Sequence, residues 1–345
     1  MRMRGVEWGR VFNASGARGF RGEGYWFHDL WRHLGLRWEG STLVTKTTTL
    51  LPRAGNMPLN DDQQPKALLP DCIVVKPAAG VVLNAVGLSG PGAAALLSDW
   101  SMGVNGRRAL LESRLQETRA RAMPMHFVIS FMSVAADAAS RLDELSTFVK
   151  MLWTPLRSWQ RENEADFPPT SVALQLNFSC PNVGLDTSHL VQEISDALDV
   201  TSVLNIPVMV KISALVPPAV ACEIAEKPGC DAIVCSNTIP WGQLPEEIPW
   251  AKLFGSTTSP LAKYGGGGLS GRPLLPVVAK WLCVARAMGL EKPVVAGGGV
   301  LSRAAADVLV DCGASAIELG SVAILRPWRV AGLIAYLNRA AWAHS

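Results

Sequence analysis

The sequence has 345 residues, of which 49% are hydrophobic, and its formal net charge is +3. This length permits one α/β barrel with insertions or two smaller domains, and the small charge without a basic run argues against nucleic acid or an anionic membrane as a partner. The seven cysteines lack metal-type CxxC spacing, and neither a signal peptide nor a membrane-spanning apolar run is found. We therefore expect a cytoplasmic protein with reduced thiols and no metal site.

Strand-like and helix-like segments alternate along the chain. Apolar or β-branched runs predict strands that start near Val11, Thr42, His126, Val172, Val208, Asp231, Val294 and Ser315. Helices are predicted over 24–36, 89–97, 141–159, 187–198 and 274–288. A shorter helix follows, whose predicted buried face consists of Ala305, Val308, Leu309 and Cys312, and a final helix is predicted from Trp328. Two irregular stretches, near 51–83 and 240–268, are too long for ordinary connections.

Eight strands that alternate with helices predict a single (β/α)8 TIM barrel over residues 1–345, with the two irregular stretches as inserted loops. A doubly wound open sheet is the alternative. Barrel active sites lie at the carboxyl ends of the strands. The strand-end residues Lys46, Asn177, Lys211 and Asn237 are therefore expected to share one pocket.

The stretch LQLNFSCPN, from Leu174 to Asn182, contains a candidate proton-transfer group. An alternating strand ends there, and Cys180 lies between the amide side chains of Asn177 and Asn182. A free cysteine has a pKa of about 8.5, so a partly ionised thiol is a reasonable base. The alternative is that Cys180 is a small buried hydrophobic residue.

Glycine-rich turns follow the last two predicted strands, at Gly298–Gly299 and Gly320–Ser321. Barrels often bind a phosphate with these two loops, because glycine lets backbone amides approach its oxygens. FMN is favoured over a phosphorylated substrate. Lys211, near the end of the fifth strand, would then stabilise negative charge on the reduced ring; alternatively it is a surface lysine at a strand end.

Eight motifs together resemble the class 1 dihydroorotate dehydrogenases over nearly the whole chain and in the order of that family. They are TKTTTLLPRAGN from Thr45, LNAVGL from Leu83, LNFSCPN from Leu176, VKIS from Val210, SNT from Ser236, GGLSG from Gly267, GGGV from Gly297 and LGS from Leu319. The resemblance implies a barrel that holds FMN and oxidises dihydroorotate to orotate in pyrimidine biosynthesis.

The resemblance also implies roles for individual residues, with Cys180 as the catalytic base. The implied substrate-binding residues are Lys46, Asn84, Gly87, Leu88, Asn177, Asn182, Asn237 and Thr238. The implied flavin-binding residues are Ala14, Ser15, Gly16, Lys46, Thr47, Lys211, Gly271, Gly298, Gly299, Gly320 and Ser321. The chemistry agrees, because oxidation across a C–C bond needs a base for the proton and an acceptor for the hydride.

Other features bear on substrate and partner. The third strand reads FVISF, which puts Val128 or Ile129 where the family has a polar flavin contact, and the segment after Asn182 is shorter than the family's usual lid. Alternative functions are oxidation or reduction of another dihydropyrimidine or cyclic amide, and noncatalytic flavin binding. The electron acceptor stays open among fumarate, NAD through a partner flavoprotein, and a quinone. An iron–sulfur cluster would belong to a partner, and the resemblance suggests a homodimer.

Overall fold

The computed structural model describes residues 1–98, 126–164, 171–178 and 187–339. Within these ranges eight strands form one sheet in the order β3-β14-β13-β10-β9-β8-β7-β4. They are β3 (Val11–Asn13), β4 (Leu43–Val44), β7 (Phe127–Phe131), β8 (Val172–Asn177), β9 (Val208–Ile212), β10 (Ala232–Cys235), β13 (Val294–Gly297) and β14 (Ala316–Leu319). The edges meet because Thr42 bridges to Phe12 and donates its N–H to the Val11 carbonyl at 2.8 Å. The predicted TIM barrel is confirmed, and the open doubly wound sheet is excluded.

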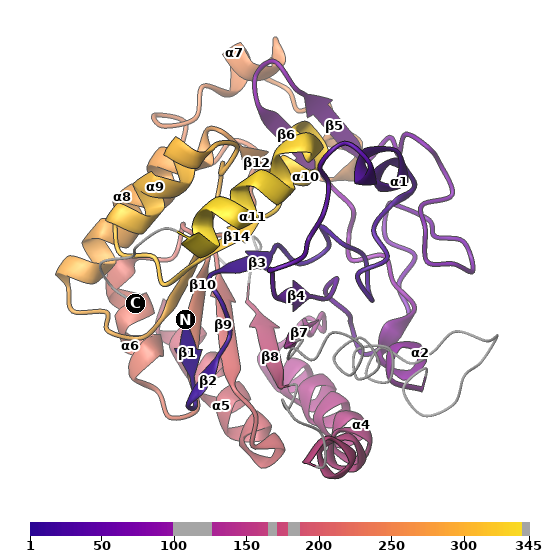
Figure 1. Cartoon of the computed structure of the whole chain (residues 1–345), viewed down its shortest axis with the longest axis vertical. Helices are drawn as coiled ribbons and strands as arrows, with labels where there is room; N and C mark the ends of the chain where they lie inside the picture. Colours follow the sequence, from indigo (N-terminus) through magenta and orange to yellow (C-terminus); the bar gives the residue numbers. More distant parts are fainter. Residues whose placement is uncertain (99–125, 165–170, 179–186, 340–345) are drawn as a thin grey trace.

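Helices surround the strands on the outside of the barrel (Figure 1). They are α1 (Trp26–Arg32), α2 (Gly92–Ser98), α4 (Ala138–Glu164), α5 (Thr187–Thr201), α6 (Pro218–Glu226), α8 (Leu274–Ala287), α9 (Arg303–Asp311), α10 (Val322–Leu325) and α11 (Val330–Arg339). Strand residues such as Ile129, Leu174 and Val210 are fully buried in the core that these helices share. Burial of this apolar surface holds the helices against the strands. No helix in the described ranges is long and apolar enough to cross a bilayer.

The buried stripe predicted for α9 is partly wrong. Ala305 and Leu309 are buried, but Val308 is 41% exposed and the fully buried neighbour is Ala306. The helix begins at Arg303, with the Ser302 side chain accepting a hydrogen bond from the Ala305 amide. This start sets the phase in which positions 305, 306 and 309 face the barrel.

The interior of the barrel has an apolar lower layer. It consists of Phe12, Val44, Val128, Ala173, Met209, Ala232, Val234, Val295 and Ala316, closed by Met1, Met3 and Trp8. The hairpin of β1 (Arg2–Met3) and β2 (Val6–Glu7) lies at this end of the barrel (Figure 1). Strand side chains alternate between two faces, so the interior is reached again two residues further along each strand.

The two long insertions are not irregular throughout. They contribute β5 (Ile73–Lys76), β6 (Val81–Asn84), β11 (Ile239–Pro240) and β12 (Gly268–Gly271), together with the short helix α7 (Trp250–Phe254). These strands form a second, antiparallel sheet in the order β11-β12-β6-β5, in which Gly268 pairs with Asn84. The sheet lies at the end of the barrel opposite the N-terminal hairpin (Figure 1). Sequence patterns miss it because its strands are short and their partners lie far apart in the chain.

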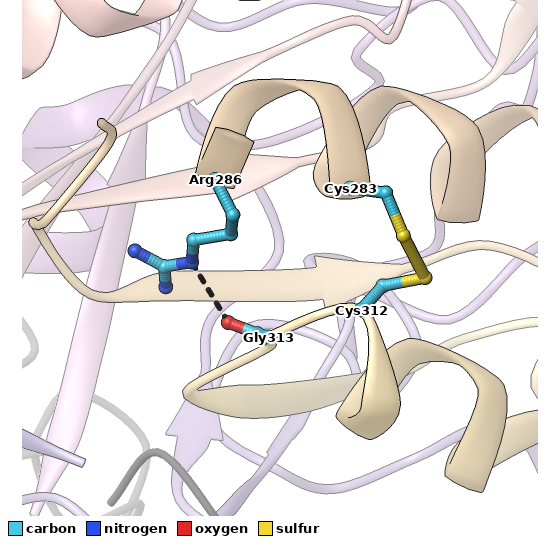
Figure 2. Close-up of a disulfide and its surroundings, with 4 residues drawn as sticks. All are labelled: Cys283, Arg286, Cys312 and Gly313. Carbon is cyan, nitrogen blue, oxygen red and sulfur yellow. Dashed lines mark hydrogen bonds between the residues drawn. A yellow bond between two sulfur atoms is a disulfide. The ribbon is translucent and has the colours of Figure 1, made fainter. Parts of the chain in front are cut away.

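A disulfide joins two of the surrounding helices. Cys283 in α8 is bonded to Cys312, which follows α9, and their Cα atoms are 4.9 Å apart (Figure 2). Beside it the Nε of Arg286 donates a hydrogen bond to the Gly313 carbonyl at 3.0 Å (Figure 2). The expectation of reduced thiols is therefore wrong for this pair, because the packing of α8 against α9 brings two residues 29 positions apart into bonding distance. Among the described residues, Cys72, Cys222, Cys230 and Cys235 are free.

Loss of this disulfide is expected to lower stability. Because the cross-link closes a loop of 29 residues, replacing Cys312 with Ser should reduce the free energy of unfolding by about 3–4 kcal/mol on the chain-entropy model. Urea unfolding with and without a thiol reductant measures this effect. The control is Cys222→Ser, which removes a half-buried free thiol and keeps the disulfide. The reductant should destabilise the wild type and this control, but not Cys312→Ser. Equal sensitivity of all three proteins would contradict the prediction.

Candidate active site

Four strands place polar side chains in the interior directly above the apolar layer. Ser130, Gln175, Lys211 and Glu318 each lie two residues beyond an apolar inward residue, and each is at most 4% exposed. The Nε2 of Gln175 donates to the Ser130 hydroxyl at 2.9 Å. Buried polar groups need such partners, since an unpaired one costs the free energy of its lost hydration. The interior thus changes from apolar to polar towards the carboxyl ends of the strands.

A chain of hydrogen bonds continues from this layer. The Thr47 hydroxyl lies 2.9 Å from the Ser130 hydroxyl and 2.7 Å from the Ser15 hydroxyl. The Asn177 Nδ2 donates to Thr47 at 3.4 Å, and the Asn237 Nδ2 donates to the Asn177 Oδ1 at 3.3 Å. These contacts bring together residues from five strands or strand ends of the barrel, those of β3, β4, β7, β8 and β10.

The two amides at the end of this chain hold each other in fixed orientations. The Asn237 Oδ1 also accepts the Thr238 amide at 2.8 Å, which leaves its Nδ2 directed at Asn177. Each side-chain amide still has further donor or acceptor capacity. Asn177, Asn237 and Thr238 can therefore offer both donors and acceptors to a planar ligand with ring N–H and C=O groups.

The second sheet brings Asn84 to the same region. The Asn84 Nδ2 donates to the Gly268 carbonyl at 3.4 Å. Gly268 lies close to Thr238, because a Cβ on this glycine would be 2.2 Å from the Thr238 Oγ1. Gly87 and Leu88 follow in the loop after β6, both with positive φ, at 72° and 59°. The insertions therefore contribute to the candidate site.

Lys46 is a buried cation between the segment after β3, which contains Phe20, and the loop after β6, which contains Ser89. It is 8% exposed, its Nζ donates to the Ser89 carbonyl, and the ammonium lies 4.9 Å from the centre of the Phe20 ring. Desolvation lowers the pKa of Lys46 to about 8, although Glu23 and Cys72 act in the opposite direction. A lysine with this pKa carries its charge at neutral pH at a cost that an anionic ligand would offset.

Glycine residues, which have no side chain, follow the carboxyl ends of β13 and β14. A Cβ on Gly299, where φ is +72°, would lie 2.7 Å from the Gly271 carbonyl oxygen. A Cβ on Gly320 would lie 2.9 Å from that of Ala14, whose amide donates to the Leu319 carbonyl at 2.8 Å. Ser321 comes directly before α10. A side chain at Gly299 or Gly320 would therefore meet a neighbouring part of the chain, so both positions suit glycine.

Lys211 has a partner that the sequence analysis missed. Its Nζ lies 2.8 and 2.9 Å from the two carboxylate oxygens of Glu318, and both side chains are buried. The interpretation of Lys211 as a surface lysine is wrong, because its ammonium is paired inside the barrel.

Three residues of the polar layer were overlooked, namely Ser130, Gln175 and Glu318. Their signal in the sequence is a polar residue inside an otherwise apolar strand, two positions after an inward apolar one. The expectation for the third strand changes as well. Val128 belongs to the apolar layer and Ile129 to the outer core, so the polar position of this strand is Ser130. Cys180 and Asn182 lie outside the described residues.

Replacing Lys46 with Met should stabilise the protein near neutral pH. The pKa of this lysine is about 8 in the folded chain against 10.5 ordinarily, so its charge disfavours folding by roughly 3 kcal/mol at pH 7. The variant should gain this free energy of unfolding, reduced by the contribution of the lost hydrogen bond to Ser89. The unfolded state binds more protons between pH 8 and 10.5, so this penalty disappears as the pH rises through that window.

Chemical denaturation at several pH values tests this effect. Lys263→Met is the control, because that ammonium is exposed and pairs with Asp71. A Lys46→Met gain in unfolding free energy that stays constant from pH 7 to pH 10.5, or that the control shares, would contradict the assigned burial penalty.

Comparisons with known proteins agree with this geometry. The family model described as dihydroorotate dehydrogenase matches residues 11–338. Two relatives, from Endomicrobium trichonymphae and Anoxybacillus flavithermus, are each 28% identical over 328 and 333 residues; the matches cover 94% and 95% of this chain and 85% of each relative. Both are named dihydroorotate dehydrogenase B (NAD(+)), catalytic subunit.

A solved structure shares the fold. The crystal structure of ligand-free DHODH from Eimeria tenella is 20% identical, has a TM-score of 0.65, and matches 99% of this chain and 88% of its own. The resemblance drawn from the eight motifs is thus confirmed, and with it the expected oxidoreductase class. This chain belongs to the dihydroorotate dehydrogenase family.

Proposed function

We propose that this chain oxidises dihydroorotate to orotate in pyrimidine biosynthesis, as an FMN-dependent catalytic subunit. The observation that carries the proposal is the set of amide and hydroxyl groups of Thr47, Asn177 and Asn237, joined by hydrogen bonds at the carboxyl end of a barrel of this family. A pure binding protein of this fold would not need a thiol such as that of Cys180, three positions after Asn177 in the sequence.

The substrate is a cyclic diamide that carries a carboxylate. Asn84, Asn177, Asn182 and Asn237 would pair with its ring N–H and C=O groups, which need both donors and acceptors. Lys46 would neutralise the carboxylate, and this contact would offset the cost of burying its ammonium. Thr238, Gly87 and Leu88 would complete the substrate-binding surface.

FMN is the cofactor that these loops fit best. Gly298, Gly299, Gly320 and Ser321 would hold its phosphate through backbone amides, with Gly271 packed against them. Ala14, Ser15, Gly16, Lys46, Thr47 and Lys211 would surround the ring and its side chain. When bound, FMN supplies the hydride acceptor.

The proton would go to Cys180. The backbone that leads to it is fixed, because the Phe178 amide donates to the Lys211 carbonyl at 2.9 Å where β8 meets β9. For efficient transfer the base would lie about 3–3.5 Å from the carbon whose proton it takes, and a fixed strand end limits how far the following residues can move from that position.

The relatives are named catalytic subunits of NAD(+)-linked enzymes. We infer that this chain likewise passes electrons to a separate subunit that reduces NAD in the cytoplasm. Dihydroorotate oxidation in the presence of NAD, with and without extracts that contain such a subunit, would distinguish this route from fumarate or quinone.

The proposed reaction predicts a visible signal. The purified protein should show a flavin spectrum that bleaches on anaerobic addition of dihydroorotate. Cys180→Ala should keep the flavin, but its rate of bleaching should fall at least a hundredfold, as when other general bases are removed. Cys222→Ala, a thiol outside the barrel interior, is the matched control. Flavin that stays oxidised with dihydroorotate but bleaches with an uncharged dihydropyrimidine would refute the substrate and favour another cyclic amide.

A glycine substitution tests the phosphate loop. Gly299→Ala should lower FMN affinity by more than tenfold, because the added methyl meets the Gly271 carbonyl in a strained backbone conformation. Gly289→Ala is the control, since its φ is +93° but nothing lies within 4 Å of its Cβ. The affinity of each variant for FMN is measured by ultrafiltration. An equal loss of FMN affinity in both variants would show that backbone strain, and not contact with the Gly271 carbonyl, causes the loss.

A further inference from the structure

The Lys211–Glu318 pair is a closed electrostatic unit inside the barrel. Both carboxylate oxygens of Glu318 contact the one ammonium, at 2.8 and 2.9 Å. The two residues come from β9 and β14, between which β10 and β13 lie in the sheet. Their side chains therefore meet across the interior rather than along neighbouring strands, so this contact requires two long side chains that point towards each other.

The chain leaves room for this carboxylate. Gly297, the last residue of β13, pairs with Glu318 in the sheet register. A Cβ on Gly297 would lie 2.9 Å from the Glu318 Cβ and 3.0 Å from its Oε2. Any other residue at this position would displace the carboxylate from Lys211, so the glycine serves the ion pair as well as the loop that follows it.

The pair lies next to the proposed flavin site. Glu318 comes two residues before Gly320, Gly297 comes directly before Gly298, and Lys211 belongs to the same inner layer as Gln175 and Ser130. Cys235 also lies within electrostatic range of the pair, and burial raises the pKa of its thiol, so it adds no charge. Of these neighbouring groups, only the Lys211 ammonium and the Glu318 carboxylate carry charge; the other ammonium assigned to the flavin site, Lys46, is the same in every variant compared below.

Hydrogen-bond capacity remains on both partners. An ammonium has three N–H donors, and the Glu318 oxygens take two of them. The third is available for an acceptor on a flavin ring, and each carboxylate oxygen can accept one more bond, as from a ribityl hydroxyl. The pair can therefore hold a flavin without coming apart.

We propose that Glu318 is a positioning residue that fixes the Lys211 ammonium and cancels most of its charge, and so lowers the reduction potential of the bound flavin. This inference rests on the proposed flavin cofactor. Reduction places negative charge on the ring, and an unpaired lysine would favour that state strongly. A lysine held by a carboxylate offers direction for a hydrogen bond but little net charge.

The test is the flavin midpoint potential, measured by reductive titration against a reference dye without dihydroorotate. Glu318→Gln keeps the shape but leaves Lys211 uncompensated, so the potential should rise. At an effective dielectric constant of about 20, one unit charge changes the ratio of affinities for reduced and oxidised flavin by about a thousandfold from about 4 Å away and by about tenfold from about 10 Å away. Glu193→Gln, which breaks the Arg141–Glu193 pair between α4 and α5, is the control and should leave the potential unchanged.

A second variant keeps the proposal testable if Glu318→Gln does not fold. The double replacement Lys211→Met with Glu318→Met removes a buried pair of no net charge, a change that proteins often tolerate. Its potential should lie much closer to that of the wild type than the Glu318→Gln potential does, because this variant loses a hydrogen bond to the flavin but no net charge. A marked fall would show that the lysine acts as a full charge and would overturn the proposal.

The remaining outcomes are separable. A Glu318→Gln variant that binds both redox states more weakly by the same factor has lost only structure, which overturns the proposal. A raised potential in a protein that dihydroorotate fails to bleach would support the role of Glu318 and refute the substrate. A wild type that binds no flavin would overturn both.

Discussion

Closure of the eight strands into a barrel places every second side chain in an interior from which solvent is excluded. The side chains that fill this interior determine the arrangement of the site above them. The lower layer is apolar and is closed by Trp8 and the N-terminal methionines. Above it, every polar group must find a partner within the barrel or on a ligand. Ser130 and Gln175 bond to each other, and Lys211 bonds to Glu318. The mouth of the barrel is thus a network of groups whose positions are fixed before any ligand arrives.

Buried charge is the feature that distinguishes binding residues from packing residues here. Lys46 has a carbonyl and an aromatic face as neighbours and its pKa falls, whereas Lys211 has a carboxylate in contact. A buried cation with no carboxylate in contact destabilises the fold and suits a site that receives an anion. A cation with a built-in counter-ion is already satisfied and suits a site where direction matters more than charge. The two lysines of the pocket are therefore not equivalent.

Sequence patterns were sufficient for the barrel and for most of the residues at its mouth. Parallel strands that alternate with helices have few compact arrangements, and strand ends such as Asn177 and Asn237 then meet at one face. The patterns could not reveal contacts that depend on distant partners. Glu318 reads as one polar residue in a short apolar strand, β6 finds its partner in β12, and Cys283 meets Cys312 only because α8 packs against α9.

The second sheet makes the two insertions a single structural unit, although more than 150 residues separate Asn84 from Gly268 in the sequence. Each insertion supplies backbone hydrogen bonds that the other needs. Shortening either one would leave an unpaired strand edge at the mouth of the barrel, where exposed edges invite association between chains. A deletion that aims to open the pocket therefore has to remove both insertions.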